Sequence, residues 1–128
     1  MPVRSLGSSI LRWPDRDAVH EAARRWAEDL ARHRPEVLRV GYFGSYARGD
    51  WGVGSDLDLV MVVESSPHPF PRRAAAYDAT SLPVPCDLLA YTEDEWDRLP
   101  ASAPPRRETV WVFERRHESR TSVDVELE

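Results

Sequence analysis

The chain has 128 residues and a formal net charge of −5, which is the size of one domain. Apolar residues make up 41% of it and charged residues 30%, which is typical of a globular protein and too apolar for a disordered one. No apolar run approaches the ~20 residues of a membrane span, and polar residues and Pro14 interrupt every apolar stretch near the start. We therefore expect one domain over residues 1–128 that is neither secreted nor membrane-bound, with the cytoplasm as its location.

Residue usage excludes several kinds of chemistry. All 17 basic residues are Arg, so mechanisms that need a lysine, such as a Schiff base or a P-loop lysine, are ruled out. The single Cys86 cannot form an internal disulfide, and no Cys and His residues have zinc-ligand spacing. The 22 acidic residues outnumber the basic ones, which argues against stable binding to duplex DNA.

The first half of the chain shows one helical and two strand patterns. Apolar residues at helical spacing predict a helix that begins after an N-cap at Asp15 or Asp17 and continues to about His33. A strand is predicted at 37–43, then a glycine-bounded turn at 44–50 with room for one or two helical turns. The apolar run 57–63 predicts a central strand, and residues 9–13 could form a further short one.

The second half alternates loops with short elements. We predict a short helix at 72–77, a third strand at 84–91, a helix from a capping box at 92–95 through Leu99, and a fourth strand at 109–113. Pro83 and Pro85 lack backbone donors, so the third strand should begin at an edge or outside the ladder. We expect the tails, 1–14 and 114–128, to be flexible or partner-binding. The order of elements predicts an α/β (α+β) fold, a mixed sheet of about four strands with helices packed on one face.

Two carboxylates at the start of the central strand are the first sign of a site. Asp56 and Asp58 are two residues apart, so both side chains should leave the same face of the sheet. Neighbouring carboxylates repel each other unless a cation lies between them. Because all the donors are oxygens, Mg²⁺ or Mn²⁺ suits the pair better than zinc.

A strand that runs directly into Gly44-Ser45 is the second sign. Backbone N–H groups, the Ser45 hydroxyl and a helical turn can together bind an anion, and Gly44 allows a close approach. Arg48, one turn further, is either a phosphate contact or a salt-bridge partner of Asp50.

A third carboxylate, Asp87, lies within the apolar sequence of the third predicted strand. If that strand lies beside the central one, Asp87 completes a triad with Asp56 and Asp58, and three carboxylates can hold two metal ions for in-line attack on a nucleotide's α-phosphate. Asp78 is a weaker alternative for the third carboxylate. We interpret the neighbouring Cys86 as a packed small hydrophobic residue, and Trp51 as either a stacking platform for a base or a cap on its loop.

Residues 44–63, GSYARGDWGVGSDLDLVMVV, together with Asp87, resemble the DNA polymerase β-like nucleotidyltransferase superfamily. They are most similar to its minimal nucleotidyltransferases, stand-alone domains often paired with helical HEPN proteins as toxin and antitoxin. The resemblance implies that Asp56 and Asp58 bind two Mg²⁺ ions, that Asp87 binds the catalytic ion and helps to activate the attacking hydroxyl, and that Gly44 and Ser45 hold the β- and γ-phosphates.

The activity expected from these residues is Mg²⁺-dependent transfer of a nucleoside monophosphate, AMP from ATP, to an acceptor hydroxyl. By resemblance the acceptor is a HEPN-type partner protein, although a second copy of this chain could also supply it. Two alternatives stay open: an antibiotic-type nucleotidyltransferase that modifies a small molecule, and an antitoxin that masks its partner without catalysis.

Overall fold

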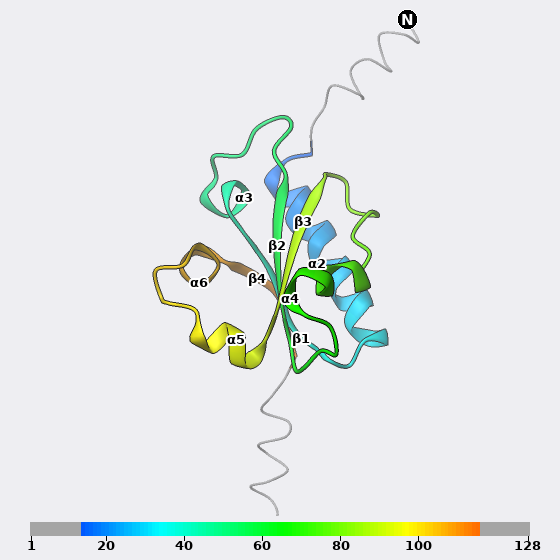
Figure 1. Ribbon diagram of the computed structural model, residues 1–128. Coiled ribbons are helices and arrows are strands. Elements are labelled where there is room, and N and C mark those ends of the chain that lie inside the picture. Colours follow the sequence, from blue (N-terminus) through cyan, green and yellow to red (C-terminus); the bar gives the residue numbers. More distant parts are fainter. Residues whose placement is uncertain (1–13, 116–128) are drawn as a thin grey trace, which may run out of the picture.

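The computed structural model describes residues 14–115 (Figure 1). The expected tails, apart from residues 14, 114 and 115, and the short strand at 9–13 lie outside this range. Two short helices, α4 (Phe70–Arg73) and a 3₁₀ turn η1 (Ala74–Ala76), lie between the second and third strands. The remaining elements are α2 (Arg16–His33), β1 (Val37–Phe43), α3 (Ser45–Arg48), β2 (Leu57–Val63), β3 (Cys86–Thr92), α5 (Glu93–Arg98), α6 (Pro104–Glu108) and β4 (Val110–Glu114).

The strands form one mixed sheet in the order β3-β2-β1-β4. β1 pairs antiparallel with both β2 and β4, whereas β2 and β3 run parallel. The prediction of a mixed four-stranded sheet is confirmed, and the apolar run of β2 does lie in the interior of the sheet. Because β2 and β3 point the same way, they start at the same end of the sheet, which is also the end where α3 lies (Figure 1).

Helix α2 covers one face of the sheet. Asp15 caps it by accepting a hydrogen bond from the backbone of Ala18 at 2.8 Å, as the sequence predicts. Its buried side chains are Val19 and three alanines, and their small size lets the helix lie close to the strands. The alternate residues Leu57, Leu59, Met61 and Val63 of β2 point into this layer.

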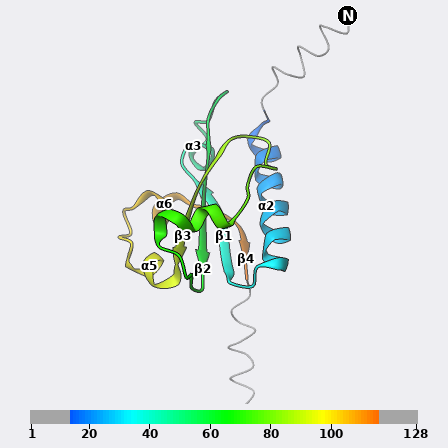
Figure 2. The same cartoon turned by 45° about the vertical axis from the view of Figure 1, so that its right-hand side comes forward.

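A smaller cluster covers the opposite face, where α5 and α6 lie (Figure 2), so the expectation that the helices pack on one face is wrong. Here Trp96 of α5 is 5% exposed and packs on Val60 and Val62 of β2. Trp96 also meets Trp111 of β4 edge to face at 5.4 Å between ring centroids. Asp58 belongs to the same alternating set as Val60 and Val62, so its side chain leaves this face.

Several element bounds differ from those that the sequence predicts. The segment 100–108 contains α6, where we expected only a loop, and the helical residues near 72–77 begin earlier, at Phe70. The third strand begins at Cys86 rather than at residue 84, so Pro83 and Pro85, which lack backbone N–H donors, both precede the strand. Among residues 14–115, no helix is long and apolar enough to span a membrane.

Candidate functional site

Asp58 and Asp87 lie side by side on neighbouring strands. In the parallel register of β2 and β3, Asp58 is the direct partner of Asp87, and such strands run about 4.8 Å apart. The pKa of Asp58 is raised above its usual value, first because burial disfavours the charged form, and then because the carboxylates of Asp87 and Asp56 repel it. The structure therefore places Asp58 and Asp87 side by side, with Asp56 near enough to act on Asp58 electrostatically.

Asp78, the alternative third carboxylate, has a different environment. Its Oδ1 accepts hydrogen bonds from the backbone N–H and the hydroxyl of Thr80, at 2.9 and 2.7 Å, within the loop that precedes β3. These bonds lower the pKa of Asp78. Asp78 thus holds a turn together, whereas Asp87 projects from the sheet beside Asp58.

Gly44 lies directly against the Asp58 carboxylate. A Cβ atom built on Gly44 would lie 2.2 Å from Asp58 Oδ2, far closer than van der Waals contact. The backbone of Gly44 has φ 79° and ψ −149°, a conformation that is essentially restricted to glycine. The turn after β1 can therefore approach the carboxylates only because residue 44 has no side chain.

Ser45 and Arg48, at the two ends of the single turn α3, extend the site from Gly44. Ser45 is partly exposed, and its carbonyl accepts hydrogen bonds from Gly49 and Asp50 that close the turn. Arg48 is exposed, and its Nε donates to Asp50 Oδ2 at 3.1 Å. The salt-bridge role that we considered for Arg48 is thus present in the structure.

Glu108, at the end of α6, is a charged neighbour of the site that the sequence analysis missed. It accepts hydrogen bonds from Arg48 Nη1 at 3.3 and 3.4 Å, and its charge contributes to the raised pKa of Asp58. The signal that could have revealed α6 is the pair Pro104-Pro105, because proline is favoured in the first turn of a helix.

The donor set fits a divalent cation of the Mg²⁺ kind. Asp56, Asp58 and Asp87 offer only carboxylate oxygens, and a cation between them would relieve the repulsion that raises the pKa of Asp58. In the part of the chain that the structure describes, no three His, Cys, Asp or Glu side chains are arranged so that they could hold a metal ion as they stand. Binding an ion would therefore require these carboxylate side chains to adopt other positions.

Cys86 and Trp51 both have structural roles here. The Cys86 thiol is partly buried and donates to the Val84 carbonyl at 3.3 Å, and burial raises its pKa to about 11, which keeps it neutral. Trp51 stacks on Tyr46 with ring centroids 5.5 Å apart, so it packs against α3 and closes the loop between α3 and β2.

Comparisons with known proteins identify a family match and similar solved structures. A family model described as "Nucleotidyltransferase domain" matches residues 23–117. A solved structure described as a nucleotidyltransferase from Sulfolobus solfataricus is 23% identical, with a TM-score of 0.61 over 80% of this chain and 86% of that one. A toxin–antitoxin structure with AMP-PNP is 15% identical, with a TM-score of 0.47 over 81% of this chain and 88% of that one. No curated protein matches the sequence closely enough to count as a relative.

Proposed function

The chain belongs to the nucleotidyltransferase-domain family, and on that basis we propose that it transfers AMP from ATP to an acceptor hydroxyl and releases pyrophosphate. The family is the one expected from the Gly-Ser turn and the two aspartates of the central strand. The reaction forms a bond between the acceptor oxygen and the α-phosphorus and breaks the bond between the α-phosphorus and the bridging oxygen of pyrophosphate.

The observation that carries the proposal is the pairing of Asp58 with Asp87 on neighbouring strands, with Asp56 near enough to repel Asp58 and the backbone of Gly44 directly against the Asp58 carboxylate. In our proposal these carboxylates hold two Mg²⁺ ions, with Mn²⁺ as a substitute. The ions would neutralise the α-phosphate and the departing pyrophosphate. Asp87 lies on β3, the edge strand of the sheet, and it accepts the proton of the attacking hydroxyl.

The turn after β1 would hold the β- and γ-phosphates of ATP, which leave as pyrophosphate. Gly44 brings the backbone close to the carboxylates, and the Ser45 hydroxyl can donate to an oxygen of the β- or γ-phosphate. Arg48 is paired with Asp50 and Glu108, so it can reach a phosphate oxygen only by exchanging one of these partners. Arg48 therefore tunes nucleotide affinity in this proposal rather than the chemical step.

The acceptor hydroxyl belongs to a partner protein, by resemblance to the minimal nucleotidyltransferases that are paired with HEPN proteins. The reaction takes place in the cytoplasm. Residues 14–115 form one sheet with its helices, and no second domain from this part of the chain covers the carboxylates. A macromolecular acceptor can therefore reach the site directly. A second copy of the chain could serve as the acceptor in the same way.

The test is incubation of the purified chain with α-labelled ATP, GTP, CTP and UTP and Mg²⁺, alone and with proteins encoded beside it. Label on a partner protein, lost in Asp58→Asn and kept in the matched control Asp97→Asn, is the expected result. Asp97 is exposed on α5 and lies outside the proposed site. If only a small molecule carried the label, the acceptor would be that molecule and not a partner protein. If the folded protein transferred no label with any nucleotide or partner, the proposal would be overturned.

A further inference from the structure

A groove of about 990 Å³ lies beside the candidate site. One wall is the start of β3, including Cys86, Asp87 and Leu88, and the other is the segment from Ala74 to Pro85. Pockets of roughly 300–1,000 Å³ are the size that holds a small ligand or a short stretch of chain. Because Asp87 belongs both to this lining and to the carboxylate group, whatever occupies the groove lies next to the candidate site.

The groove exposes the outer edge of the sheet. β3 is the last strand on its side, and its backbone groups alternate in direction. The Pro85 carbonyl accepts from Leu57 of β2 at 2.8 Å, whereas the Ala90 carbonyl accepts from Arg73, on the outer side, at 2.9 Å. By this alternation Cys86 and Leu88 direct their N–H and C=O groups outward.

No residue between 14 and 115 hydrogen-bonds to the outward backbone groups of Cys86 or Leu88. Further along β3, the side chain of Arg73 covers the edge at Ala90. Arg73 is only 5% exposed and also pairs with Glu95 at 2.6 Å. A free edge of this kind is a template for an added strand. Repeated N–H and C=O groups match a peptide backbone, and a sugar ring or a nucleobase offers no such repeat.

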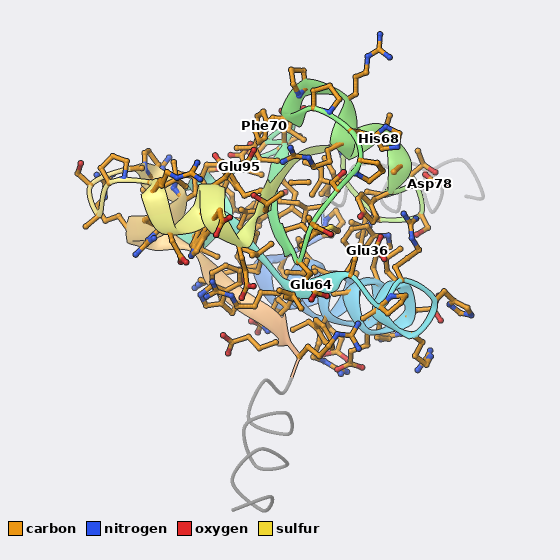
Figure 3. All side chains as sticks on the ribbon, turned by 60° about the horizontal axis from the view of Figure 1, so that its bottom comes forward. Glu36, Glu64, His68, Phe70, Asp78 and Glu95 are labelled. Atoms are coloured by element: carbon orange, nitrogen blue, oxygen red, sulfur yellow. The ribbon has the colours of Figure 1, made fainter. Side chains whose placement is uncertain are left out.

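The charge of the groove selects the peptide. Asp78, whose pKa is lowered by its bonds to Thr80, is the acidic lining residue that lies outside the proposed metal site, and it favours a positive charge on the peptide. Asp87 also lines the groove, and no Arg or His is among its lining residues in the described part of the chain. Tyr77 also lines it, and burial together with a hydrogen bond to Glu36 raises the pKa of Tyr77 to about 12, so it stays neutral. Arg34, stacked on the Tyr77 ring, is itself paired with Glu36. Figure 3 shows Asp78 on the same side of the molecule as Glu36, away from Glu95.

We propose that the groove holds an extended, positively charged segment of a partner protein, which pairs with the free edge of β3 and places its acceptor hydroxyl beside Asp87. Directly opposite residues on paired strands have Cβ atoms about 4.5–5.5 Å apart, so a hydroxyl side chain on the face of Asp87 lies next to its carboxylate. This proposal rests on the nucleotidyl transfer proposed above, and it adds how the acceptor is recognised.

Binding is tested separately from catalysis, with the full chain and a fluorescent peptide, Arg-Val-Tyr-Val-Arg, followed by fluorescence anisotropy. We expect the peptide to bind both the unaltered protein and Asp58→Asn. Methylation of the peptide nitrogens that face β3 should weaken binding about tenfold or more, because at least two hydrogen bonds are lost. Methylation of the alternate nitrogens should have little effect. Equal binding of both methylated peptides, or of a peptide with Glu in place of Arg, would overturn the proposal.

Two protein variants and one control test whether the peptide binds in the groove. Ala75 is exposed and lines the groove, so Ala75→Arg should add bulk and positive charge there without disturbing the core, and should abolish peptide binding. Asp78→Asn, which can keep the turn at Thr80, should weaken binding several-fold, and Asp97→Asn should not.

Label transfer from ATP distinguishes the two proposals. Peptide binding as expected without any transfer counts against the proposed function and leaves the groove assignment standing. Transfer to a partner protein or small molecule that is equally fast in Ala75→Arg overturns the groove assignment and leaves nucleotidyl transfer standing. The peptide with Phe in place of Tyr should bind equally well and accept no label.

Discussion

Gly44→Ala tests whether the close approach of the turn to Asp58 matters. The added Cβ would lie 2.2 Å from Asp58 Oδ2, so the carboxylate or the turn must move by about 1 Å to restore normal contact. The φ of 79° and ψ of −149° add strain of roughly 1–3 kcal/mol for any residue with a side chain. A shift of that size in a group that positions the reacting atoms can cost about 100-fold in rate.

Gly49→Ala is the matched control, because it adds the same methyl group at the other end of α3. Gly49 has φ 89°, but a Cβ there meets no atom within 4 Å. We expect Gly49→Ala to lower the free energy of unfolding in urea by about 1 kcal/mol and to leave label transfer nearly unchanged. Gly44→Ala should lower it by roughly 2–4 kcal/mol and reduce transfer about 100-fold. If Gly44→Ala matched Gly49→Ala in both measurements, the assigned role of the contact with Asp58 would be wrong.

Three further predictions concern the charged groups. Asp58→Asn in EDTA should be no less stable to heat than the unaltered protein, because it removes a carboxylate that Asp87 and Asp56 repel, and added Mg²⁺ should raise the melting temperature of the unaltered protein alone; equal shifts in both would contradict the carboxylate metal site. Arg48→Ala should raise KM for ATP more than it lowers kcat in the transfer assay, because Arg48 reaches the phosphates only by leaving Asp50 or Glu108; a fall in kcat at constant KM would place Arg48 in the chemical step. Arg73 lowers the pKa of Glu95, so the stability that this carboxylate contributes is present above its unfolded pKa of 4.5 and is lost as the pH falls through the lower folded value. Glu95→Gln should therefore be less stable than the unaltered protein at pH 7 in urea unfolding, with the difference narrowing as the pH falls below 4.5. A difference independent of pH would exclude this ion pair as the cause.

Much of the candidate site could be predicted because its signals are local. Asp56 and Asp58 share a face through the two-residue alternation of a strand, and Gly44-Ser45 follows a strand directly. The third carboxylate needed a condition that the sequence does not supply, namely that the strand of Asp87 lies beside β2 in parallel. The sequence already favours Asp87 over Asp78, because Asp87 lies in a predicted strand and Asp78 does not, but only the register shows that Asp87 is the direct neighbour of Asp58.

Local chemistry accounts for the helix bounds of α2, the capping box before α5, and the strand cores, since each depends on residues within a few positions of one another. Contacts between distant segments were decided only by the packed fold: the pairing of Arg48 with Glu108, the contact of Gly44 with Asp58, and the groove along the free edge of β3. The physical reason is that sheet order and register follow from burying both faces of β2 at once. That condition sums over the whole chain, and no single segment of the sequence carries it.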